Sequence, residues 1–64
     1  MINNKIIWAE FVRSDNKRKI LINIENIQAM EERHNATILY VGDNHEITVE
    51  GGLQATTDTI AQMY

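Results

Sequence analysis

The chain has 64 residues, a formal net charge of −3 and no cysteine. These values exclude disulfides and thiolate metal sites, argue against a whole-molecule attraction for nucleic acid, and leave room for one small domain, residues 1–64. The apolar runs are far shorter than the ~20 residues of a membrane-spanning helix, and no secretory signal opens the chain, so we expect a cytoplasmic protein without a membrane span.

The first predicted strand, residues 5–13, is apolar on both of its faces. One face carries Ile7, Ala9 and Phe11, and the other carries Ile6, Trp8 and Val12. A polar turn at residues 14–16 precedes a second strand, residues 19–24, in which isoleucines point inward. Its outward residues are Lys19, Leu21 and Asn23. The two strands predict a hairpin with a basic tip.

Residues 24–33 are compatible with two structures. Ile24, Ile27 and Met30 recur at the three-residue spacing of a helix, and several of their neighbours are good helix formers. Only ten residues separate the flanking strands, however. We therefore predict a turn at Glu25 and Asn26 and a short strand over residues 27–32, with a helix as the alternative.

Residues 36–50 have the pattern of a second hairpin, around which the other elements are organised. Two runs rich in β-branched residues, 37–41 and 46–49, flank the turn-forming sequence Gly-Asp-Asn-His. The first run is apolar on both faces, which predicts a central strand or a subunit contact. The second run alternates, with Ile47 and Val49 inward.

The last predicted element is a short helix within residues 53–64, after the break at Gly51 and Gly52. Its expected apolar stripe consists of Leu53, Thr57, Ile60, Ala61 and Tyr64. Gly52 or Thr56 would cap the helix, and Asp58 would lie in its first turn. The predicted fold is α+β, an antiparallel meander of four to five strands with a C-terminal helix, and a small SH3-like β-barrel is the alternative.

Three segments resemble the small flagellar FlbD-type proteins: INIENIQAME at residues 22–31, TILYVG at 37–42 and ITVE at 47–50. With the helix, the resemblance spans residues 11–63 and rests on hydrophobic spacing and the N-I-E-x-I turn. It implies a short bacterial protein that is associated with flagellar motility and has no enzymatic chemistry. The same turn resembles the DNA-binding domains of LytTR-type response regulators, which are longer.

The sequence predicts no catalytic site, metal site or cofactor, and hence no enzyme. The two glycines at 51 and 52 form no phosphate-binding motif, and Ser14 lies in a polar turn rather than at a nucleophile elbow. His34 and His45 fall in separate turns, which favours surface histidines over metal ligands.

Basic residues cluster in one place only, at Arg13, Lys17, Arg18 and Lys19. This basic tip has two interpretations. It could bind a small anionic ligand, such as a nucleotide, or a nucleic-acid backbone. It could equally be a solvated hairpin end whose charges discourage pairing between sheet edges.

The predicted interface consists of Ile6, Trp8, Val12 and Tyr40. Trp8 is either a core residue or an anchor between subunits. A single helix covers one face of a small sheet, so we expect a homodimer or a larger symmetric oligomer. The predicted function is a non-enzymatic regulatory or protein-interaction module with itself, and with another protein, as partner. The alternative function is binding of an anionic ligand or nucleic acid at the basic tip.

Overall fold

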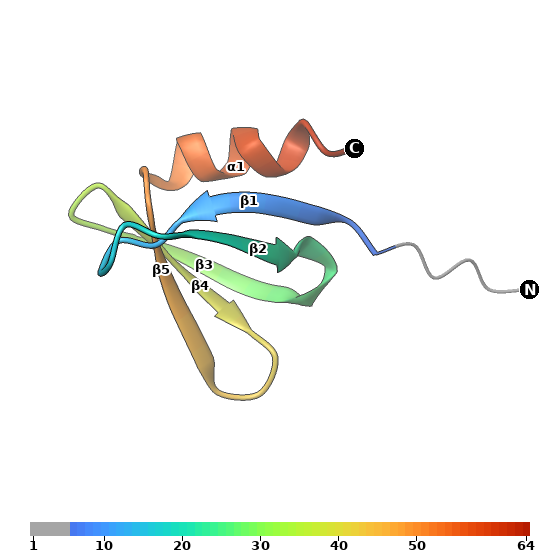
Figure 1. Ribbon diagram of the computed structural model, residues 1–64, viewed down its shortest axis with the longest axis horizontal. Coiled ribbons are helices and arrows are strands. Elements are labelled where there is room, and N and C mark those ends of the chain that lie inside the picture. Colours follow the sequence, from blue (N-terminus) through green and yellow to red (C-terminus); the bar gives the residue numbers. More distant parts are fainter. Residues whose placement is uncertain (1–5) are drawn as a thin grey trace, which may run out of the picture.

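A computed structural model describes residues 6–64, which form five antiparallel strands and one C-terminal helix (Figure 1). The elements are β1 (Trp8–Val12), β2 (Lys19–Asn23), the 3-10 turn η1 (Ile24–Asn26), β3 (Ile27–Arg33), β4 (Ala36–Val41), β5 (His45–Glu50) and α1 (Leu53–Ala61). The predicted α+β fold is confirmed. The predicted first strand is longer than β1, and its Lys5 lies outside the described residues.

β1 and β2 form a two-stranded hairpin. Ala9 lies opposite Ile22 and Phe11 opposite Ile20, so these four side chains share the face that is turned to the core. At the tip, the amide of Arg13 donates to the carbonyl of Arg18 at 2.8 Å. The strict alternation of β2 thus produces the hairpin that the sequence predicts.

The segment that was compatible with a helix is a turn followed by a strand. Asn23 caps η1, because its side-chain oxygen accepts a hydrogen bond from the amide of Glu25 at 3.1 Å. β3 then pairs with β4, with a bulge between Ile27 and Ala29. The prediction of a strand is confirmed, and the helical alternative is wrong.

β4 is the centre of a three-stranded sheet in the order β3-β4-β5. Leu39 is fully buried, as expected for a strand that is covered on both sides. Between β3 and β4, His34 and Asn35 both have positive φ angles, 52° and 63°. That geometry is the one a two-residue hairpin loop requires, so β3 continues to Arg33, one residue beyond the predicted strand.

The two sheets meet at a single isolated bridge within residues 6–64, between Arg13 and Val49. The amide of Ser14 extends the contact by donating to the carbonyl of Thr48 at 2.8 Å. β1 and β5 make no further ladder with each other, and β2 is not paired with β3. The strands therefore do not close, and the barrel alternative is wrong. Joined through this bridge, the strands follow the order β2-β1-β5-β4-β3, which leaves β2 and β3 at the ends.

The core lies between the sheets. It consists of Ala9, Phe11, Ile22, Ile24, Leu39, Val41 and Val49. α1 packs against β3 and β4, and Ile60 reaches the core from the helix. The expected helical stripe is right only at Ile60: Leu53, Thr57, Ala61 and Tyr64 are exposed, whereas Thr56 is buried.

Thr56 is buried because its hydroxyl belongs to a hydrogen-bonded chain between the helix and the sheet. Its hydroxyl donates to Oγ1 of Thr37 at 3.0 Å, and the hydroxyl of Thr37 donates to the carbonyl of Gly51 at 2.9 Å. Both threonines are at most 2% exposed. Buried hydroxyl groups need such partners, and here they fix the position of α1 on β4.

The start of α1 is held by a side chain from β3. Gly52 is the N-cap residue, and the carboxylate of Glu32 accepts a hydrogen bond from the amide of Leu53 at 2.7 Å. The helix therefore obtains its N-terminal negative charge from another strand, because Asp58 lies beyond the first turn.

Candidate functional site

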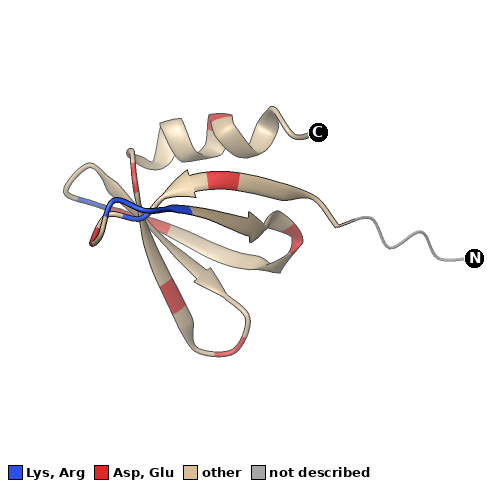
Figure 2. Ribbon diagram, in the orientation of Figure 1, with Lys and Arg blue, Asp and Glu red and all other residues tan. Residues whose placement is uncertain are grey.

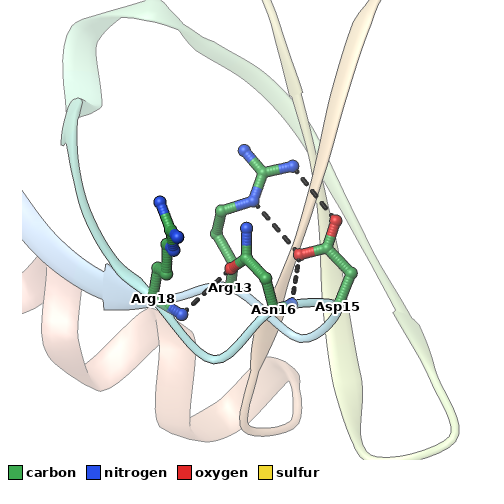
Figure 3. Close-up of polar contacts among 4 residues, drawn as sticks. All are labelled: Arg13, Asp15, Asn16 and Arg18. Carbon is green, nitrogen blue, oxygen red and sulfur yellow. Dashed lines mark hydrogen bonds and ion pairs between the residues drawn. The ribbon is translucent and has the colours of Figure 1, made fainter.

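Four basic positions lie together at the β1–β2 tip, whereas acidic positions are distributed along the whole described chain, the tip included (Figure 2). At this tip, Nε and Nη2 of Arg13 donate to the two carboxylate oxygens of Asp15, at 3.2 and 3.3 Å (Figure 3). The hydrogen bond raises the pKa of Arg13 and lowers the pKa of Asp15. Arg13 is therefore already occupied by a neighbouring carboxylate.

The local backbone is shaped by short polar side chains. Asp15 accepts a hydrogen bond from the amide of Asn16 at 2.6 Å, and Asn16 accepts one from the amide of Arg18 at 3.0 Å. Lys17, between them, has a φ angle of 62°. These contacts compete with the strand ladder and end it at this point.

Two other members of the basic tip are also paired. Lys17 contacts Glu50 at the end of β5, and Nζ of Lys19 lies 3.8 Å from a carboxylate oxygen of Glu10 on the neighbouring strand. Within residues 6–64, Arg18 is the one member without an ion pair. The structure thus brings all four predicted residues to one tip, but three of them face carboxylates.

A second candidate site is the side of the β1–β2 hairpin that points away from the core, which we term the outer hairpin face. Three large apolar side chains are exposed here: Ile6 (58%), Trp8 (50%) and Leu21 (60%). Val12 is partly buried, and the Glu10–Lys19 pair lies on the same face. Apolar side chains of this size that lie together on one surface are a feature of interaction sites.

Leu21 was missing from the predicted interface, although its position contained a signal. It is a large apolar residue at an outward position of a strand that otherwise alternates between apolar and polar residues. Trp8 is half exposed, so the interpretation as a filled core residue is wrong for the single chain.

Tyr40, the fourth predicted interface residue, belongs to the other sheet. Its hydroxyl donates to a carboxylate oxygen of Glu31 at 3.0 Å. This hydrogen bond is the main cause of a raised Tyr40 pKa, and the negative charge of Glu46 contributes. By strand register, Glu31 and Glu46 share with Tyr40 the side of β3-β4-β5 that points away from Leu39, which we term the acidic sheet face.

Among residues 6–64, no group of three or more metal-binding side chains comes together. His34 lies in the β3–β4 turn, and His45 begins β5. No helix in this part of the chain is long and apolar enough to cross a membrane.

Comparison with protein-family models, characterised proteins and solved structures gives no match for this chain.

Proposed function

We propose that this chain is a small non-enzymatic protein-interaction or regulatory module of the cytoplasm that works as a homo-oligomer. The observation that supports this proposal best is the outer hairpin face, with Ile6, Trp8 and Leu21 exposed on one surface. So small a core rarely stabilises a domain by more than ~3–5 kcal/mol, and association would add to this value.

Charge favours the outer hairpin face over the acidic sheet face for contact between copies. On the outer hairpin face, Glu10 and Lys19 balance each other. On the acidic sheet face, Glu46 lies opposite Tyr40 and Glu31 lies diagonally across from it on β3. Arg33 shares this face but balances only one of these charges, so two such faces would repel each other. Tyr40 is therefore not part of the interface that we propose.

The resemblance to FlbD-type proteins agrees with a regulatory role. The N-I-E-x-I turn that carries it corresponds to Asn23–Ile27, which includes η1. On this basis we propose a bacterial regulatory protein without catalytic activity of its own.

Size-exclusion chromatography with light scattering tests the proposal. Leu21→Ser should weaken self-association at least ~10-fold, because burying a side chain of this size contributes about 1.5–3 kcal/mol. Met63→Ser is the matched control, since Met63 is 42% exposed and lies outside this face. Equal association of the Leu21→Ser and Met63→Ser variants would contradict the proposed interface.

Binding of an anionic ligand at the basic tip is the second candidate function. Figure 3 favours it in one respect, because Arg13 and Arg18 extend to the same side of the tip. A ligand would have to compete with Asp15 for Arg13 and with Glu50 for Lys17. If the site exists, Lys17→Glu with Arg18→Glu abolishes binding of a nucleotide probe, and salt weakens binding to the wild type. If the double variant binds the nucleotide probe as well as the wild type does, the basic tip is not the binding site.

A further inference from the structure

The hydrogen bonds of the β1–β2 hairpin fix which backbone groups of β2 point away from β1. Pairing is seen between Arg13 and Arg18 at one end, and the amide of Ile24 donates to the carbonyl of Ile7 at 3.0 Å at the other. In an antiparallel ladder, hydrogen-bonded and non-hydrogen-bonded pairs alternate. Ile20 and Ile22 therefore bond to β1, and the backbone N–H and C=O groups of Leu21 face the open edge.

The two terminal strands differ in how well their edges are protected. β3 has a bulge, and its last three residues, Glu31, Glu32 and Arg33, are charged. Bulges and charges are the usual means by which edge strands avoid pairing with other chains. β2 has a regular register and the sequence Lys-Ile-Leu-Ile-Asn, with one charged residue at its start. Among the strands of residues 6–64, the edge of β2 is therefore the one without such protection.

We propose that two copies of this chain associate by pairing β2 with β2 in antiparallel orientation, with Leu21 on the two-fold axis. This inference rests on the proposed homo-oligomeric function and specifies its geometry. Leu21 of one copy exchanges backbone hydrogen bonds with Leu21 of the second copy, and Lys19 lies opposite Asn23. The register is self-complementary, because every outward-pointing backbone group of one strand meets an outward-pointing group of the other.

The side chains fit the same register. Leu21, which is 60% exposed in the single chain, packs against its own copy across the axis. Lys19 faces the uncharged Asn23, so no like charges are opposed. The two outer hairpin faces become one continuous four-stranded surface, and Trp8 lies one strand away from Lys19 of the second copy.

Engineered cysteines test the register, because the chain has no native thiol. Residues in a hydrogen-bonded antiparallel pair have Cα atoms ~5.5 Å apart, within the range of a disulfide. Leu21→Cys should therefore form a disulfide-linked dimer under mild oxidation. Lys19→Cys is the matched control on the same strand and face. Its two copies would be about 14 Å apart along the strands, too far for a disulfide, and it should crosslink at least ~10-fold more slowly.

Backbone N-methylation of Leu21, by chemical synthesis, provides a second measurement that keeps the side chain. By the β1–β2 register, the Leu21 amide is not bonded within residues 6–64, so the circular dichroism spectrum stays that of the wild type. Dimerisation, in contrast, weakens at least ~10-fold. Equal crosslinking of both cysteine variants, or an N-methylated chain that dimerises normally, would overturn strand pairing and leave self-association intact. A wild-type chain that is monomeric at every concentration would overturn both the strand pairing and the proposed self-association.

Discussion

At the residue scale, Tyr40 and Glu31 form a pair whose titration can be measured. The pKa of Tyr40 in the folded chain is raised above its ordinary value of 10.0. The Glu31 carboxylate accepts a hydrogen bond from the Tyr40 hydroxyl, which favours the protonated phenol over the phenolate. Because this pKa is raised, the contribution of the Tyr40–Glu31 hydrogen bond to folding stability is fully present below pH 10.0 and is lost as the pH rises through the pKa of the folded chain.

Glu31→Gln should therefore lower the pKa of Tyr40 toward the ordinary value. Ultraviolet absorbance of tyrosinate during an alkaline titration measures this change. Tyr64, whose pKa is raised by a hydrogen bond to Glu25 at 2.7 Å, is the internal reference and should not move. A Tyr40 titration that is unchanged in the variant would show that the contact with Glu31 is absent in solution.

The two buried threonines make unequal contributions to stability. Thr37→Val removes the hydrogen bond to Gly51 and also the acceptor of Thr56, so it should lower the free energy of unfolding by about 1–3 kcal/mol. Thr56→Val leaves the bond from Thr37 to Gly51 in place, so the loss should be about 0.5–1.5 kcal/mol.

Urea denaturation measures these losses. The double variant should lose less than the sum of the two single variants, because the Thr37–Thr56 hydrogen bond is counted in both. Strict additivity, or a larger loss for Thr56→Val than for Thr37→Val, would contradict the hydroxyl chain.

At the scale of elements, the link between β3 and α1 depends on Glu32 and Gly52. A Cβ atom at Gly52 would lie 2.9 Å from a carboxylate oxygen of Glu32, so any larger residue displaces the group that binds the Leu53 amide. Glu32→Ala should cost about 0.5–2 kcal/mol of stability, as for the loss of other N-terminal caps. Glu32→Gln should cost less, because the amide oxygen can still accept the bond.

The substitution Gly52→Ala measures the energetic coupling between Gly52 and Glu32. It should destabilise the wild type and have little effect in the Glu32→Ala background, where nothing is displaced. Thermal unfolding of the wild type, the two single variants and the double variant measures this difference in a double-mutant cycle. An equal effect of Gly52→Ala in both backgrounds would show that Gly52 does not influence the hydrogen bond between Glu32 and the Leu53 amide.

Elements whose pattern is local could be predicted from sequence. The alternation of Ile20 and Ile22, and the two apolar runs around Gly42, determine strand positions without reference to the remaining chain. The helix was placed correctly, but its buried side was not, because Thr56 is buried by a hydrogen bond to a residue in another element. Hydrophobic spacing contains no information about such a partner.

In the candidate site, too, local features could be predicted from the sequence and contacts between distant elements could not. The sequence predicted that the basic residues meet at one tip, which follows from hairpin connectivity. That Lys17 contacts Glu50 depends on the bridge between Arg13 and Val49, a long-range contact. Likewise, the exposure of Trp8 follows from the arrangement of the two sheets, in which no other element of residues 6–64 covers the outer side of β1.

At the scale of the whole molecule, the outer hairpin face and the open edge of β2 adjoin, because Leu21 belongs to both. The chain has no disulfide, and the described residues hold no metal-ligand cluster, so neither kind of crosslink supplements this small core. We therefore propose that association of two copies supplies the additional stability that this fold needs.

Sedimentation equilibrium of the wild-type protein, over a wide range of concentrations, tests this claim most directly. The average mass should rise with concentration from 7.4 kDa toward twice that value, and the melting temperature should rise in parallel, because association stabilises the folded chain by mass action. A mass of 7.4 kDa and one melting temperature at every concentration would contradict the account.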